Sequence, residues 1–145
     1  LSRMMTTFGS GAVVGALIVA WLGKFEHMGR TLLRVQIIFG VIVAAFALMP
    51  INGFSYLLLF LGGTALLVIF SLTNSLVQLT VPDELRGRVI SIYLVAFRGG
   101  MPLGSLVSGY LITQFSAPAV IAITGLLLSL VATIYLAGRW QVKEL

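Results

Sequence analysis

The sequence predicts an all-α protein, a polytopic membrane bundle of five transmembrane helices, and three observations support that fold class. Hydrophobic residues make up 59% of the chain and charged residues only 9%, an apolar share beyond that of an ordinary soluble domain. The apolar residues form five runs of a length that suits helices crossing a hydrocarbon core of about 30 Å. The basic residues stand at the ends of these runs rather than in one patch. The net charge of +5 therefore indicates membrane topology and no nucleic-acid partner.

The first two spans are expected at about 6–22 and 32–49. The first contains Gly11 and Gly15, whose spacing lets another helix pack closely, although glycine is also common in membrane helices generally. The chain begins at Leu1 and enters this span without the features of a signal peptide, so we expect a fragment of a longer protein.

The third span, expected at about 54–81, carries one polar stripe on an otherwise apolar helix. Its members fall at i, i+3, i+4 and i+7: Ser71, Asn74, Ser75 and Gln78. Lipid does not tolerate such a stripe, so it faces either a water-filled cavity or a neighbouring helix that accepts its hydrogen bonds. Both interpretations stay open from the residues alone.

A polar turn, residues 81–88 with the sequence VPDELRGR, separates the third and fourth spans. Pro82 cannot continue the incoming helix, and Asp83 is expected to cap the outgoing one. The turn supplies five candidate gating residues: Asp83, Glu84, Arg86, Gly87 and Arg88. The alternative is that the two arginines only fix topology.

The fourth span is expected at about 88–115 and contains the costliest residue of the chain, Arg98, near mid-bilayer. Insertion scales assign such an arginine about 2.5 to 3.5 kcal/mol, which an anion, a carbonyl group or a substrate must offset. Arg98 and Ser105 share a face with Pro102, which is expected to kink the helix. The alternative is an arginine that snorkels to water beside a static kink.

The fifth span is expected at about 119–137. It and the second span are apolar around most of their circumference. The distribution of basic residues sets the orientation. Seven of them lie at one membrane face, and Arg3 lies at the other. The residues at the basic face are Lys24, Arg30, Arg34, Arg86, Arg88, Arg139 and Lys143. We therefore expect both basic loops and the C-terminus to be cytoplasmic.

Residues 74–89, with the sequence NSLVQLTVPDELRGRV, are followed by Ser91, Tyr93 and the segment Gly100–Gly104 (GMPLG). Together they resemble the C-terminal half of a major facilitator superfamily transporter. They are most similar to the transmembrane secretion effector branch, which contains macrolide-efflux and siderophore-export permeases. The resemblance implies that these five spans are the eighth to twelfth of twelve helices, and that the missing N-terminal helices of the same polypeptide are their partners.

The family has a gating signature, Asp-Arg-x-Gly-Arg, in an earlier loop. This sequence carries a degenerate copy of it, with Glu26 at the aspartate, His27 at the first arginine, and Gly29 and Arg30 at the final pair. The resemblance also implies that the third span, as the family's tenth helix, lines a central cavity. It assigns Glu26, Gly29 and Arg30 to the gating residues.

The resemblance implies a secondary transporter in the bacterial inner membrane that exports an amphipathic organic solute by alternating access, with protons as the coupling ion. All four carboxylates lie in loops or at the end of the chain, so no span offers a membrane-embedded proton carrier. No hydrolase, phosphate-loop or metal-ligand motif is present, so we expect neither an enzyme nor a cofactor or metal site. A non-transporting membrane scaffold or lipid-handling protein is the alternative.

The charge asymmetry makes a topology prediction. The chain has no cysteine, so single cysteines can be introduced at chosen positions. Cysteines at Asn52 and Ala117 should react with an impermeant thiol reagent outside intact cells. Those at Glu26 and Asp83 should react only after permeabilisation. The reverse labelling pattern would contradict the orientation.

Overall fold

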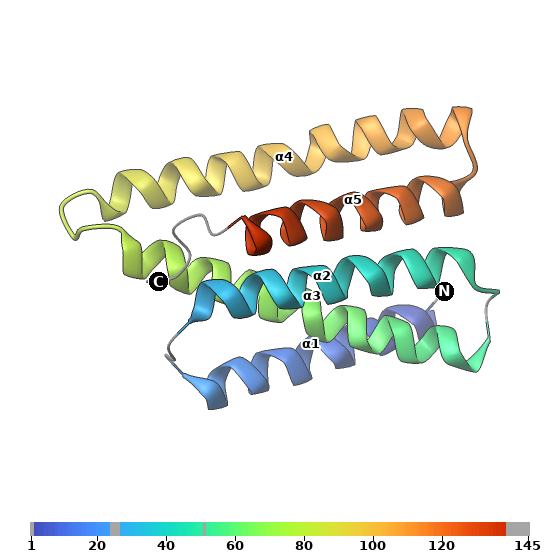
Figure 1. Cartoon of the computed structure of the whole chain (residues 1–145), viewed down its shortest axis with the longest axis horizontal. Coiled ribbons are helices and arrows are strands. Elements are labelled where there is room, and N and C mark those ends of the chain that lie inside the picture. The colour runs from blue at the N-terminus through green and yellow to red at the C-terminus, as the bar shows by residue number, and fades with distance from the viewer. Residues whose placement is uncertain (1, 24–26, 51, 139–145) are drawn as a thin grey trace.

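The computed structural model describes residues 2–23, 27–50 and 52–138, and its architecture is a bundle of five long helices (Figure 1). The helices are α1 (Ser2–Leu22), α2 (Met28–Leu48), α3 (Gly53–Thr80), α4 (Arg86–Gln114) and α5 (Ala117–Ala137). All five are long and apolar enough to cross a membrane, and the described ranges contain no strand. The expected fold class, an all-α polytopic membrane bundle, is confirmed.

The helix ends follow from local hydrogen bonding. At the start of α3, Asn52 and Ser55 form a capping box: Asn52 Oδ1 accepts from the Ser55 amide at 3.3 Å, and Ser55 Oγ accepts from the Asn52 amide at 3.3 Å. The first helix begins at Ser2, earlier than expected. The Thr6 hydroxyl donates to the Ser2 carbonyl at 3.0 Å, so this polar turn satisfies itself within the helix.

The expectation that Asp83 caps the fourth helix is wrong. The N-cap of α4 is Leu85, which has no side-chain capping bond, and the helix begins at Arg86. The chain turns through backbone hydrogen bonds instead, from the Leu85 amide to the Pro82 carbonyl at 3.0 Å and from the Arg86 amide to the Asp83 carbonyl at 3.4 Å. This turn places Asp83 too far before the helix for its carboxylate to act as the cap.

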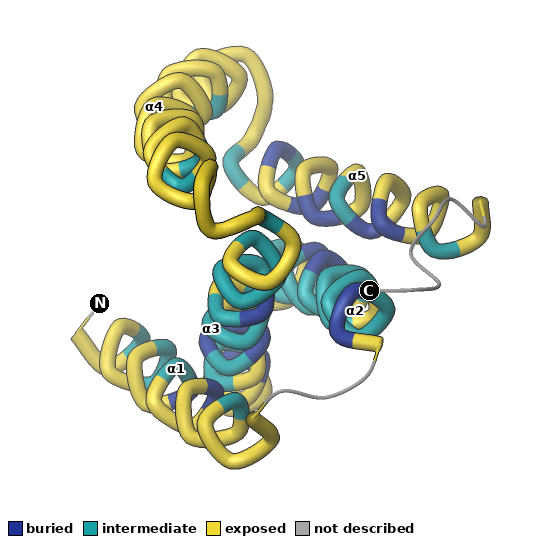
Figure 2. The backbone as a smooth tube through the Cα atoms, turned by 90° about the vertical axis from the view of Figure 1, so that its left-hand side faces the viewer, coloured by how far each residue is buried: buried dark blue, intermediate teal, exposed yellow. Residues whose placement is uncertain are grey.

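Helix α3 lies in the middle of the bundle, with α1 on one side and α2 on the other, and α5 packs on α2 (Figures 1 and 2). The contact between α1 and α3 is made backbone to backbone. Gly11 and Gly15 are buried, and a Cβ atom at either would overlap a carbonyl oxygen of α3, that of Phe60 or Thr64. The Thr64 hydroxyl crosses the interface and donates to the Gly11 carbonyl at 2.9 Å. The predicted glycine packing face is confirmed.

The contact between α2 and α5 uses the same principle. Gly40 of α2 and Gly125 of α5 are both buried, and a Cβ at Gly125 would lie 2.6 Å from the Gly40 carbonyl oxygen. The Ser129 hydroxyl donates across this interface to the Ile37 carbonyl at 3.0 Å. Helices α2 and α5 are therefore joined to each other by small residues and one interhelical hydrogen bond.

Helix α4 differs from the others because it buries no residue (Figure 2). It makes few contacts with α3 and α5, and on the α3 side the Phe97 ring centroid lies 5.5 Å from that of Phe70. The turn that leads into α4 lies at the same end of the bundle as the end of α1 and the start of α2 (Figure 1). Arg30, Arg86 and Arg88 consequently share one end of the bundle.

The glycine contacts make a stability prediction with an internal control. Gly11→Ala should destabilise the protein by about 1 to 3 kcal/mol, because the added methyl group meets backbone that cannot move aside. Gly9→Ala, in the same helix, should have little effect, since no atom lies within 4 Å of its Cβ position. Thermal unfolding of the purified variants in detergent measures both. Equal midpoints would show that the close contact does not hold α1 against α3.

Candidate functional site

The polar stripe of α3 is only partly covered. Ser71, Asn74 and Ser75 are half-buried and Gln78 is exposed. The Asn74 amide donates to the Phe70 carbonyl of its own helix at 3.0 Å. Over the described part of the chain, no side chain of the stripe bonds to another helix. The stripe therefore has polar side chains without hydrogen-bond partners on another described helix. In contrast, the hydroxyls of Thr64 and Ser129 each bond to a neighbouring helix.

The position of the stripe follows from the unequal lengths of α1 and α3. The two helices run in the same direction (Figure 1), and Gly15 packs against the backbone of Thr64. Seven residues further on, where a helix face repeats after two turns, α1 ends at Leu22 while α3 reaches Ser71 and continues to Thr80. The stripe thus extends the α1-facing line of α3 past the end of α1. Helix α3 thus becomes polar on this face at the level where the apolar helix α1 ends.

Arg98 lies on the uncovered side of α4. The preceding residue, Phe97, stacks against Tyr93 at a centroid distance of 6.1 Å and contacts Phe70 of α3. One helical residue turns the side-chain direction by about 100°, so Arg98 is directed away from α3, and it is exposed. Within the described ranges its guanidinium forms neither an ion pair nor a hydrogen bond to another side chain. Arg98 is therefore available to a group from outside these helices.

The other members of this face are satisfied locally. The Ser105 hydroxyl donates to the Pro102 carbonyl at 2.8 Å, and the Ser91 hydroxyl donates to the Gly87 carbonyl at 2.8 Å. Helix α4 is continuous through Pro102, which has no amide to offer the Arg98 carbonyl. The kink at Pro102 stays a prediction. The charge of Arg98 is thus the dominant polar feature of the face.

An apolar cavity of about 490 Å³ lies between α3 and α4, on the other side of α4 from Arg98. Its wall on α4 is formed by Tyr93, Phe97 and Met101, and its wall on α3 includes Phe70 and Leu66. Sequence reasoning missed this cavity. The available signal was the spacing of Tyr93, Phe97 and Met101 at i, i+4 and i+8, one large side chain per turn on one face of α4. A cavity with this lining suits the apolar part of a small molecule.

The turn between α3 and α4 is solvent-exposed. Arg86 Nη2 pairs with Asp83 Oδ1 at 2.5 Å, within the turn itself. An exposed pair of this kind contributes little to stability, typically about 0.2 to 1 kcal/mol. Glu84, Gly87 and Arg88 are exposed as well. The charges of the turn are therefore accessible to contacts outside the chain's own helices.

The degenerate signature of the first loop is described only in part. Glu26 lies outside the described residues. His27 has a left-handed backbone with φ 66° immediately before α2, Gly29 is buried, and Arg30 is half-buried in the first turn of that helix. Over the described ranges, no group of three His, Cys, Asp or Glu side chains could hold a metal ion.

A family model described as transmembrane secretion effector matches residues 2–144, nearly the whole chain. The chain belongs to this family of major facilitator transporters, so the recognition made from residues 74–104 is confirmed. No curated protein and no solved structure gave a match. Family membership and the five membrane-length helices together define a multi-pass membrane protein of a transporter family that contacts the lipid bilayer and a small-molecule substrate.

Proposed function

We propose that this chain belongs to the C-terminal half of an exporter of amphipathic organic solutes that works by alternating access. In this proposal α1 to α5 are the eighth to twelfth of twelve helices. The missing N-terminal helices of the same polypeptide face α3 and α4 across a central cavity. The protein would reside in the bacterial inner membrane with its C-terminus cytoplasmic, as the distribution of basic residues indicates.

One observation carries this proposal: α4 is a membrane-length helix with an arginine near its middle and no buried residue. Such a helix is too costly to leave facing lipid on all sides, because the charge needs a partner or water. The polar stripe of α3 is also left without interhelical partners among the described residues. Both features are explained if Arg98 and the stripe line a cavity that is completed by helices beyond these five.

The cavity between α3 and α4 supports the amphipathic character of the solute. Its aromatic wall, formed by Phe70, Tyr93 and Phe97, offers an apolar surface to the solute. Arg98 offers a charge on the uncovered side of the same helix. Export and proton coupling follow from the family resemblance. The proton carrier is assigned to the missing helices, because the four carboxylates of this sequence all lie in loops or at its end.

Arg98 provides the test of this proposal in the complete transporter. Arg98→Leu should leave insertion and abundance largely intact but abolish transport or change its specificity. Arg98→Lys should retain part of the activity because it keeps the charge. Solute uptake into inside-out vesicles measures both variants. Full transport by Arg98→Leu would show that the arginine only extends its charge to water at the membrane surface. If the wild type takes up none of the amphipathic solutes tested, the result would favour a non-transporting scaffold.

The exposed turn is proposed as a cytoplasmic latch. Arg86 and Arg88 would meet acidic or carbonyl groups of the other half when the cytoplasmic mouth is closed, and would be released when it opens. Contacts made in only one state bias the equilibrium between the states, here by about 1 to 3 kcal/mol. The exposure of Asp83, Glu84 and Arg88 supports this role, since the turn is free to reach another surface.

The latch predicts a change in accessibility. Asp83→Asn combined with Arg86→Gln should lower turnover and raise the labelling rate of a cysteine at Gln78 from the cytoplasmic side. Arg3→Gln, at the opposite end of the bundle, is the matched charge control. Unchanged labelling together with lowered abundance would show instead that the turn is a folding and orientation signal.

A further inference from the structure

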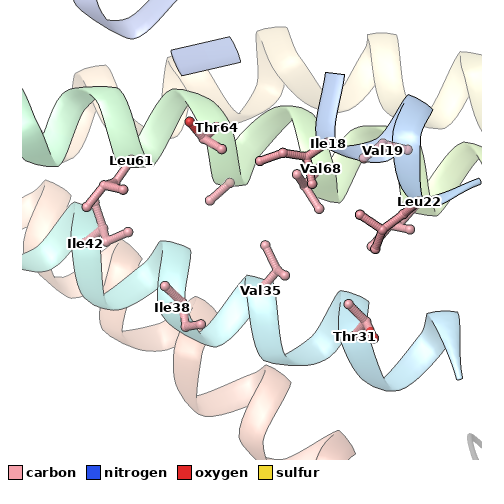
Figure 3. A pocket seen from close by; sticks show the side chains of 12 residues that line it. Ile18, Val19, Leu22, Thr31, Val35, Ile38, Ile42, Leu61, Thr64 and Val68 are labelled. Atoms are coloured by element: carbon pink, nitrogen blue, oxygen red, sulfur yellow. The ribbon is translucent and has the colours of Figure 1, made fainter. Parts of the chain in front are cut away.

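Helices α1, α2 and α3 line a second apolar cavity, separate from the polar faces of α3 and α4 (Figure 3). Its volume is about 340 Å³. Each of the three helices contributes aliphatic side chains that point into the space, among them Ile18, Leu22, Val35, Ile38, Leu61 and Val68. Among the described residues that line it, those with polar side chains are Thr31 and Thr64, and the Thr64 hydroxyl is already bonded to the Gly11 carbonyl.

This cavity is a groove that opens on the outer surface of the bundle. Four of its lining side chains are substantially exposed: Ile18 by 41%, Leu22 by 43%, Ile38 by 56% and Leu61 by 41%. A polar solute would find almost no hydrogen-bonding partner in it. In a membrane protein, an open aliphatic groove of this kind suits a hydrocarbon chain.

The polar rim of the groove lies at one end. Arg30 and Arg34 are in the first two turns of α2, the helix whose Thr31, Val35 and Ile38 line the groove. Arg34 precedes Val35 by one residue, so it lies about 100° around the helix from the groove, and it is exposed. Neither arginine forms an ion pair within the described ranges. A positive charge therefore stands at the edge of the groove.

Helix α1, which lines the other side of the groove, has an aromatic residue at the same end of the bundle. Trp21 is in the last turn of α1 and is 88% exposed. Tryptophan is enriched where membrane helices meet the headgroup region, and arginine near helix ends reaches for the same layer. The end of the groove thus has the composition of a membrane interface, while its interior has that of the hydrocarbon core.

We propose that this groove is a binding site for an anionic phospholipid. One acyl chain lies between α1 and α2 against α3, and the phosphate lies against Arg34 with Arg30 nearby. Charge complementarity selects the anionic headgroup, and the aliphatic lining accepts the chain. A bound lipid would fill the space between α1 and α2 and so join two helices that each pack separately on α3.

Native mass spectrometry of the complete transporter, titrated with phosphatidylglycerol or phosphatidylcholine, tests the proposal. The wild type should bind one phosphatidylglycerol more tightly than phosphatidylcholine. Arg34→Gln should weaken phosphatidylglycerol binding by about fivefold, the effect expected for removing one basic residue at the membrane surface. Arg34→Lys should retain the preference, because the phosphate requires a charge rather than a guanidinium.

Two further variants localise the lipid. Val35→Trp fills the groove and should remove the tightly bound lipid of either headgroup. Arg3→Gln, at the other end of the bundle, should change nothing. The proposal is overturned if Arg34→Gln binds phosphatidylglycerol like the wild type, if Arg3→Gln weakens it equally, or if Val35→Trp keeps the lipid. Because Arg34 is exposed, the result of Arg34→Gln does not depend on a repacked interior.

Discussion

Close backbone contact between helices is the constraint on which the rest of this structure depends. In lipid, no hydrophobic force drives helices together, because the surrounding acyl chains are as apolar as the side chains. Close van der Waals packing and interhelical hydrogen bonds must therefore hold the bundle together. Here Gly11 meets α3 and Gly40 meets α5, and each contact is accompanied by one hydroxyl that reaches a carbonyl across the interface, from Thr64 and from Ser129.

The same constraint sets α4 apart. Gly99, Gly100, Gly104 and Gly109 would suit close packing, yet no atom lies within 4 Å of the Cβ position of any of them. These glycines of α4 are therefore not used for packing within the described chain, and on the α3 side the ring of Phe97 contacts that of Phe70. A helix held by a few large side chains, with its glycines and its arginine uncovered, is suited to face a partner that is not among these five helices. This is the physical basis for the proposal that α4 lines a transport pathway.

The polar side chains of the bundle divide into two groups by where their hydrogen bonds go. Most hydroxyls donate to a carbonyl three or four residues earlier in their own helix, as Thr73 and Thr133 do, and such groups cost little in lipid. Arg98 cannot be satisfied in this way, because a guanidinium carries a charge and five donors. Gln78 is exposed at the end of its stripe. A solute or a partner helix would therefore gain more binding energy from hydrogen bonds to these two side chains than from bonds to the hydroxyls.

The sequence by itself determined the five spans, the polar stripe of α3 and the arginine within α4, because apolar run length and helical period are local properties of the chain. It also identified Gly11 and Gly15 as a packing face. Only the tertiary structure showed that Gly9, in the same helix, has no packing partner within 4 Å of its Cβ position. It also showed that Asp83 pairs with Arg86 instead of capping α4, and that the stripe begins where α1 ends. The surroundings of Gly9 and the position of the stripe depend on how two helices align, which residues far apart in the chain decide together. The Asp83–Arg86 pair is local, and it depends on the backbone hydrogen bonds that form the turn. The cavities flanking α3 could not be predicted for the same reason, since each is bounded by helices whose separation no single segment encodes.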